Sequence, residues 1–131
     1  MLNIYKKFLR LFQPLINLDK IKNVYLSSNF TDLRKAIDGL SIIVETEFKL
    51  DLFEPSLFIF CNKAKNKIKI LHFDNGFWLY YRRLEKGKFK WPLLKDEIYN
   101  ITFNELKWFI NGHELRVSER KFKSINRVDI Y

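Results

Sequence analysis

The sequence predicts an α+β fold: a mostly antiparallel β-meander of four to five strands packed with two main helices, plus an N-terminal amphipathic helix. Three observations indicate it. Apolar-rich runs separated by short polar loops follow one another in residues 57–92. The dipeptide Asn75-Gly76 stands between two of these runs and favours a tight hairpin turn, because a type I′ turn needs positive φ at both central residues. Apolar residues recur at helical spacing in residues 31–48 and 102–111.

The composition is that of a folded, basic domain. The chain has 131 residues, of which 47% are hydrophobic and 17% aromatic, enough for one domain with a real core. The formal net charge of +9 points to nucleic acid, an acidic partner or an anionic membrane surface. Cys61 is the only cysteine, so no internal disulfide is expected, which suits the reducing cytoplasm. No stretch approaches the roughly 18 apolar residues of a membrane span.

We divide the chain into an N-terminal amphipathic segment (1–22), a single α+β domain (23–115) and a basic C-terminal tail (116–131). In the first segment, apolar residues such as Ile4 and Phe8 recur at helical spacing with basic residues between them. Three interpretations stay open. The segment is a helix that docks its apolar side on the domain, a helix that touches a membrane surface, or a weak targeting peptide without a cleavage site.

Within the domain, a short strand at Asn23–Ser27 precedes the first main helix. Thr31 is the expected N-cap of a helix over residues 31–48, because a threonine hydroxyl accepts a hydrogen bond from a free backbone N–H of the first turn. Arg34 and Asp38 are four residues apart, so they are expected to pair on the surface of that helix.

The meander follows. Its expected strands are Leu57–Cys61, Ile68–Phe73, Phe77–Leu84 and Phe89–Trp91. A two-residue turn at Asn75-Gly76 places Phe73 opposite Trp78, and a turn at Lys86-Gly87 leads into the fourth strand. Apolar residues fall on both faces of this sheet. Either both faces are covered, or one of them is an exposed binding surface.

The second main helix is expected over residues 102–111. Thr102 is its N-cap candidate, and Gly112 stands where a C′ residue of left-handed conformation belongs. The chain beyond it is basic. Val128–Tyr131 either adds an edge strand or is loose.

Positive charge is concentrated in the meander. Nine Lys or Arg and two acids lie between Cys61 and Trp91, a local net of +7. Antiparallel pairing gathers these cations at one end of the sheet, and a field of one sign attracts polyanions. The cations are candidates for phosphate contact, and nearby rings for sugar or base contact. The candidate nucleic-acid-binding residues are Lys63, Lys65, Lys67, Lys69, Tyr80, Tyr81, Arg82, Arg83, Lys86, Lys88, Lys90 and Trp91. The alternative is that Lys and Arg only keep a sheet edge soluble.

Nothing in the sequence suggests catalysis. His72, His113 and Cys61 are isolated, whereas a metal site needs several ligands at matched spacing. The aspartates are scattered, whereas a two-metal nuclease needs a converging carboxylate cluster. There is no glycine-rich phosphate-binding loop. We therefore expect no enzyme activity, no metal and no cofactor.

Four stretches of the chain resemble one known family. They are TDLRKAIDGL (31–40), LFIFCNKAKNKIKIL (57–71), GFWLYYRRLEKGKFKWP (76–92) and FNELKWFINGHEL (103–115). They are similar, in the same order, to the TnpB-type accessory protein of the insertion-sequence-66 family, the product of the second open reading frame beside the transposase. The larger RNA-guided nucleases that share the TnpB name are a different group.

The chain departs from the family pattern at a few points. Residues 1–22 look additional, the turn around Asn75 is one residue shorter than usual, Phe73 replaces a common Trp and Ala36 replaces a common Gly. The resemblance implies a helper in bacterial DNA transposition and supports no role for residues 1–22.

Together these observations predict a cytoplasmic, non-catalytic accessory protein that binds DNA through the basic end of its meander. The rival hypothesis is a protein-interaction module that binds the transposase without contacting nucleic acid. Its surface would be the aromatic face (Phe73, Trp78 and Tyr80) or the N-terminal helix, because exposed apolar patches mark interfaces. A third hypothesis is binding of single-stranded DNA or RNA by stacking.

Overall fold

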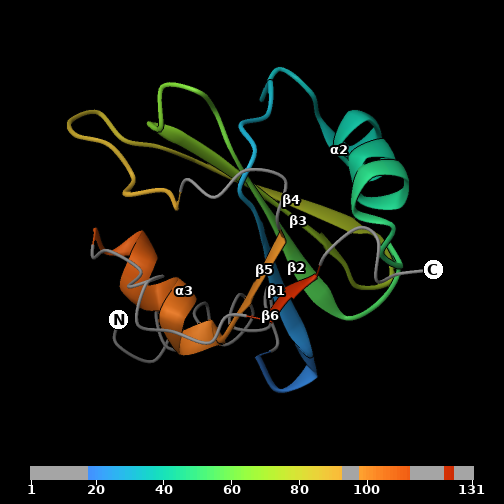
Figure 1. Cartoon of the computed structure of the whole chain (residues 1–131). Coiled ribbons are helices and arrows are strands. Elements are labelled where there is room, and N and C mark those ends of the chain that lie inside the picture. Colours follow the sequence, from blue (N-terminus) through green and yellow to red (C-terminus); the bar gives the residue numbers. More distant parts are fainter. Residues whose placement is uncertain (1–17, 93–97, 113–122, 126–131) are drawn as a thin grey trace, which may run out of the picture.

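The computed structural model of the chain describes residues 18–92, 98–112 and 123–125 (Figure 1). The expected N-terminal helix, most of the C-terminal tail and the possible strand at Val128–Tyr131 lie outside these residues. The described part begins with a 3₁₀ turn, Leu18–Lys20. None of its helices is both long enough and apolar enough to span a bilayer.

A mixed β-sheet forms the centre of the protein. Its strands are β1 (Asn23–Ser27), β2 (Ser56–Cys61), β3 (Lys67–Phe73), β4 (Phe77–Arg83) and β5 (Ile98–Ile101), with the short strand β6 (Lys123–Ile125) at one edge. Their order across the sheet is β4-β3-β2-β1-β5-β6. Among the described strands, β1 and β2 pair in parallel and the other neighbours pair antiparallel. The α+β class and the mostly antiparallel pairing are therefore confirmed.

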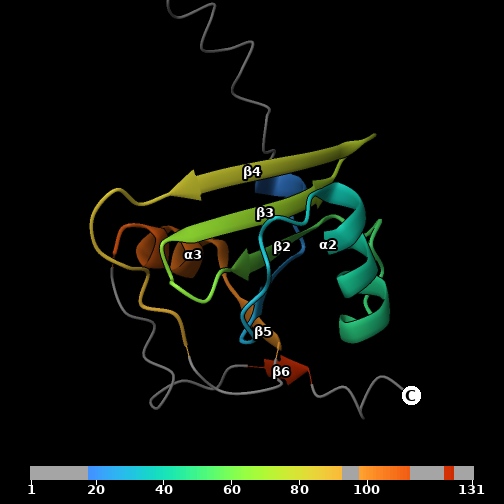
Figure 2. The same ribbon diagram turned by 90° about the horizontal axis from the view of Figure 1, so that it is seen from above.

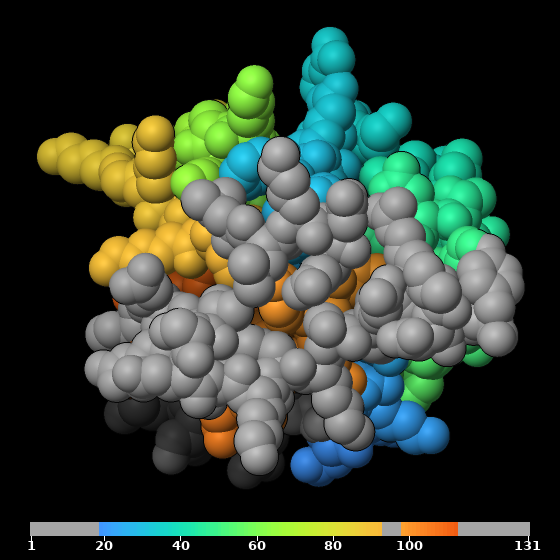
Figure 3. Space-filling view, viewed as in Figure 1, coloured from blue at the N-terminus to red at the C-terminus, as the bar shows by residue number. Residues whose placement is uncertain are grey.

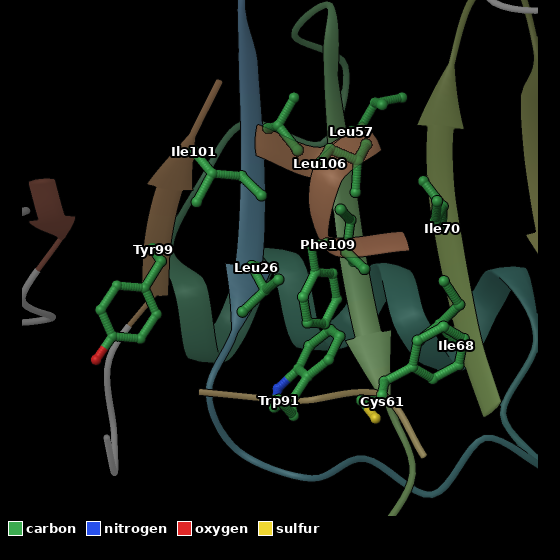
Figure 4. Packing of buried hydrophobic residues seen from close by; sticks show 13 residues of the cluster. Leu26, Leu57, Cys61, Ile68, Ile70, Trp91, Tyr99, Ile101, Leu106 and Phe109 are labelled. Carbon is green, nitrogen blue, oxygen red and sulfur yellow. The ribbon is translucent and has the colours of Figure 1, made fainter. Parts of the chain in front are cut away.

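The two helices cover opposite faces of the sheet (Figures 1 and 2). Helix α2 (Ile37–Ile43) lies on the connection between the parallel strands β1 and β2, which a hairpin could not join. Helix α3 (Phe103–Ile110) covers the other face. Buried on the α2 side are, among others, Leu40, Val44, Phe48, Phe58, Phe60 and Leu71. Buried on the α3 side are, among others, Leu26, Leu57, Ile59, Ile70, Leu106 and Phe109 (Figure 4). Both faces are thus covered over the centre of the sheet.

The first helix is shorter than the sequence predicts. Residues 31–36 are irregular, α2 begins at Ile37, and a π-helical turn at Val44–Phe48 follows it. Thr31 is not the N-cap, because its backbone N–H donates to the carbonyl of Cys61 at 2.8 Å and so ties this segment to the end of β2. Arg34 does not pair with Asp38. Its guanidinium binds the carboxylate of Asp32 at 2.6 Å.

The hairpin between β3 and β4 has a three-residue turn, not the expected two-residue turn. Asn75 and Gly76 do have positive φ, 52° and 145°. However, Phe73 lies opposite Phe77, and it is His72 that faces Trp78. The predicted register is therefore wrong by one residue, and such a slip moves every side chain of one strand to the other face.

The expected strand at Phe89–Trp91 is absent from the sheet, so β4 is an outer edge. The backbone N–H of Phe89 donates to the carbonyl of Lys65 at 2.7 Å, and the segment turns back over the α3 side of the sheet. Phe89 and Trp91 are only 2% and 4% exposed. The indole N–H of Trp91 donates to the carbonyl of Ser27 at 2.7 Å. The run is apolar because it fills the core next to Phe109 (Figure 4).

The second helix agrees with the sequence prediction. The Thr102 hydroxyl accepts a hydrogen bond from the backbone N–H of Glu105, and the Glu105 carboxylate accepts one from the backbone N–H of Thr102. This capping box satisfies two N–H groups that the helix leaves free. At the other end Gly112 has φ 92°, the left-handed conformation that ends helices.

The burial of Trp91 predicts that its indole N–H stabilises the fold. Trp91→Phe should lower the free energy of unfolding by about 1–3 kcal/mol, because the Ser27 carbonyl loses its buried donor. Urea denaturation followed by circular dichroism measures this change. Trp108→Phe is the matched control, since Trp108 is 55% exposed and should change stability by less than about 0.5 kcal/mol. Equal losses in both variants would contradict the assigned role of the hydrogen bond.

Candidate nucleic-acid interface

Three segments come together at one end of the sheet: the turn between β2 and β3, the C-terminal half of β4, and the loop that follows β4. The backbone N–H of Leu84 donates to the carbonyl of Asn66 at 2.8 Å, and that of Phe89 donates to the carbonyl of Lys65 at 2.7 Å. In Figure 3 the green β2–β3 turn and the gold loop after β4 send side chains outward from the same region of the surface. We call this region the basic end. Its cations are Lys63, Lys65, Lys67, Lys69, Arg82, Arg83, Lys86, Lys88 and Lys90.

Most of these cations face solvent. Exposed are Lys63, Arg82, Arg83, Lys86, Lys88 and Lys90, whereas Lys65, Lys67 and Lys69 are half-buried. Among the described residues, Arg83 is the member of the set with a carboxylate partner, Glu85 at 2.8 Å. Exposed ion pairs of this kind are weak. The positive charge of the basic end is thus largely uncompensated within the described part of the chain.

Two of the lysines lie close to aromatic rings. The Lys65 ammonium lies 5.9 Å from the ring centroid of Phe30, and the Lys69 ammonium lies 5.7 Å from that of Tyr81. Lys69 also donates to the carbonyl of Lys35 at 2.9 Å. These contacts favour positions of the two ammonium groups beside the rings.

Arg82 has a different environment. It lies on the face of β4 that α3 covers, since it pairs with Ile68 across the strands. Its guanidinium donates to the carbonyl of Ile110 at 3.0 Å and lies 5.9 Å from the centroid of Phe89. A cation at the C-terminal end of a helix is favourable, because the free carbonyls there carry partial negative charge. Arg82 therefore joins α3 to β4 as well as adding charge to the basic end.

A groove of about 800 Å³ opens beside the basic end on the α2 side of the sheet. Its walls come from residues 30–34, the β2–β3 turn, and the strands β3 and β4. They are Phe30, Thr31, Asp32, Leu33, Arg34, Asn62, Lys63, Ala64, Lys67, Lys69, Leu79 and Tyr81. Four of these side chains are cations and one is an acid. Hydrogen bonds from the guanidinium and the backbone N–H of Arg34 lower the pKa of the Asp32 carboxyl to about 2, so the two groups form an ion pair at neutral pH.

The three aromatic residues predicted to contact nucleic acid lie in different environments. Tyr81 is 53% exposed and lines the groove. Tyr80 is half-buried on the other face of β4 and stacks on Trp78 at 6.4 Å between centroids. Trp91 is buried in the core, so its predicted contact with nucleic acid is wrong. Sequence analysis missed Phe30 and Arg34 because it placed residues 31–48 in one helix. The sequence signal that could have found them is the aromatic residue Phe30 directly before the turn-forming pair Thr31-Asp32.

The isolated Cys61 and His72 are buried. Desolvation raises the pKa of the Cys61 thiol to about 12, so the reactive thiolate is scarce at neutral pH. Among the described residues, no group of three or more His, Cys, Asp and Glu could hold a metal ion.

Fold and surface together define a small α+β protein with a mixed sheet, two covering helices and a basic end beside a ring-lined groove. Residues 22–120 match the family model described as IS66 Orf2 like protein, well over half of the chain. The chain therefore belongs to the IS66 Orf2-like family, the accessory proteins of an insertion-sequence group, and the resemblance noted from its motifs is confirmed.

Curated relatives are similar over the same region. An uncharacterised Sinorhizobium fredii protein, y4hO, is 27% identical over 94 residues, which cover 71% of this chain and 82% of the relative. A second uncharacterised protein of that organism, y4jC, is 24% identical over 99 residues, covering 75% of this chain and 85% of the relative. No solved structure matches the chain.

The buried His72 predicts a pH dependence of stability. Its side chain is 3% exposed, and its Nδ1 has no hydrogen-bond partner among the described residues. Burial lowers the pKa of the imidazole below its ordinary value of 6.5, with a smaller opposing effect of Asp74. Below pH 6.5 the unfolded chain takes up a proton that the folded chain does not. The free energy of unfolding should therefore decrease as the pH is lowered below 6.5, by up to about 1.4 kcal/mol for each pH unit.

Urea denaturation across this pH range measures the effect. His72→Gln removes the titrating group, so the variant should show a shallower loss of stability below pH 6.5 than the wild type, whatever its absolute stability. Parallel curves for the two proteins would contradict the assignment.

Proposed function

We propose that this IS66 Orf2-like protein is a non-catalytic accessory factor that binds DNA during transposition, through the phosphates that its basic end can reach. The observation that supports this proposal is the collection of exposed cations, most of them without a carboxylate partner among the described residues, on the β2–β3 turn, the C-terminal half of β4 and the loop that follows it. Contacts with phosphates are independent of base sequence and release counterions, so such binding weakens steeply with salt. The half-buried Lys67 and Lys69 add to the positive electrostatic potential of the basic end even where they would not contact DNA directly.

Removing exposed lysines from the basic end should flatten the salt dependence of binding. In the triple variant Lys63→Ala, Lys86→Ala, Lys88→Ala, affinity for duplex DNA should fall. The slope of log K against log salt should decrease in magnitude by about 2–3, since each lost phosphate contact removes about 0.9. Fluorescence anisotropy with a labelled duplex at several salt concentrations gives the slope.

The control variant loses the same charge elsewhere, by Lys20→Ala, Lys22→Ala and Lys107→Ala, all exposed. It should keep a slope close to that of the wild type. If both triple variants lose affinity equally, binding depends on net charge and not on the basic end. If the first triple variant binds as the wild type does, the proposed interface is wrong.

We also propose, as a second candidate function, that the opposite end of the sheet binds the transposase of the same element. Four rings lie there, at the β3–β4 turn and the loop before β2. Phe53, Phe73 and Phe77 pack against one another, and Trp78 lies on the other face of β4, next to Tyr80. Phe53 lies 4.9 Å from Phe73, and Phe73 lies 5.0 Å from Phe77, between centroids. Phe53 and Trp78 are 57% and 42% exposed. We call these four residues the aromatic turn. Exposed apolar groups that lie together are typical of protein interfaces.

The double variant Phe53→Ser, Trp78→Ser should reduce co-purification with the transposase by about tenfold or more, because aromatic anchors contribute most to such interfaces. The measurement is pull-down in high salt with nuclease, which removes any tether through DNA. Ile42→Ser is the control, because Ile42 is 61% exposed on α2 and lies outside the aromatic turn. Retention of the complex by the double variant, or its loss on nuclease treatment alone, would contradict this second candidate.

A further inference from the structure

We infer that the groove beside the basic end binds an unpaired nucleotide, so that the preferred ligand is single-stranded or frayed DNA and not intact duplex. This inference rests on the proposed function and names the substrate class of the same surface. The inference depends on the groove walls at residues 30–34 and at Tyr81. Electrostatic attraction of DNA to the basic end does not need these walls.

The size and shape of the groove suit a nucleotide. Its volume of about 800 Å³ lies within the range of roughly 300–1,000 Å³ found for small-ligand sites. It is open along one side, so a strand can lie in it without being threaded. A base inside a duplex is stacked and paired, and only an unpaired base can turn its flat face to a side chain in such a groove.

Two rings line the groove from separate elements. Phe30 follows β1 and is 38% exposed, and Tyr81 on β4 is 53% exposed. Leaving both rings in contact with water is a cost that binding of a flat ligand would offset, since stacking of bases on aromatic side chains is favourable for every base.

Each of these rings has an ammonium group beside it, Lys65 next to Phe30 and Lys69 next to Tyr81. A nucleotide needs both kinds of group, a flat apolar surface for the base and a cation for the phosphate attached to it. Lys69 is already held in place by the carbonyl of Lys35. Of these two ammonium groups, that of Lys69 lines the groove, so Tyr81 and Lys69 together supply a surface for a base and a cation for its phosphate.

The charge of the groove favours nucleic acid over a peptide. Lys63, Lys67 and Lys69 line its floor and rim. Lysine is depleted in the cores of protein–protein interfaces, where aromatic residues are enriched. The one acid of the lining, Asp32, forms an ion pair with Arg34, so the remaining charge of the groove is that of the three lysines. Rings and lysines in one groove are the combination found in proteins that bind single strands.

The experiment compares a labelled oligothymidylate of about 12 nucleotides with a labelled hairpin duplex of similar charge, by fluorescence anisotropy at one salt concentration. The wild type should bind the oligothymidylate more tightly. Phe30→Leu and Tyr81→Leu should each weaken that binding about tenfold and change duplex binding less than twofold. Trp108→Leu is the matched control, an exposed ring on α3 outside the groove, and should change neither. Tyr81→Phe keeps the ring and should bind as the wild type does.

A second measurement does not depend on loss of binding. Phe30→Trp places a fluorescent ring in the groove, and the oligothymidylate should quench the emission gained over the wild type if a base stacks there. Absence of quenching in a complex that forms, or equal binding by the wild type and both leucine variants, overturns the inference. Tighter binding of duplex than of oligothymidylate also overturns it while leaving the proposed function intact. Failure of the wild type to bind either polymer overturns both.

Discussion

The burial of β2 on both faces is the constraint on which the rest of the structure depends. All six residues of Ser56–Cys61 are buried, so neither face of this strand is exposed to solvent. One face must therefore be closed by α2 and the other by α3 with Phe89 and Trp91. Charged side chains are then excluded from the middle of the sheet. Most cations of the meander therefore lie at the strand ends, in the turns and on the edge strand β4, where the basic end forms, and the half-buried Lys69 lies inside β3 next to Tyr81 of the edge strand.

The same packing makes the basic end a composite surface. The loop after β4 could leave the sheet in any direction, but Phe89 and Trp91 must reach the core on the α3 side. Their burial draws Lys86, Lys88 and Lys90 back along the β2–β3 turn. Arg82 adds a cross-connection to the end of α3 through Ile110. A core interaction on one side of the sheet thus determines where charge lies at its end, and this is why the buried indole of Trp91 and the exposed Lys88 and Lys90 belong to one structural unit.

Several features could be predicted from sequence because a local signal is sufficient for them. The strands in the 57–84 region follow from apolar runs, and α3 follows from Thr102 and Gly112 at its two ends. The remaining features depend on contacts between distant residues. The parallel pairing of β1 with β2 and the attachment of Thr31 to Cys61 have no local signature. The aromatic run at 89–91 has the composition of a strand, yet it fills a core. Asn75-Gly76 was recognised as a turn, but the third turn residue, Asp74, shifts the register and with it the face on which Tyr81 lies.

The two proposed surfaces lie at opposite ends of β3, and their separation has a physical consequence. Seven residues of strand at about 3.3 Å each give a distance of about 23 Å between the β2–β3 turn and the aromatic turn. Charges at the surface are screened over about 8–10 Å at physiological salt. The field that attracts phosphates to the basic end therefore decays before it reaches the rings at the other end. DNA bound at one end would neither repel nor cover a protein bound at the other end. The two proposed activities are therefore compatible in one small protein. Under the two proposals, the sheet between these surfaces, which is packed on both faces, would set the distance between a bound transposase and bound DNA.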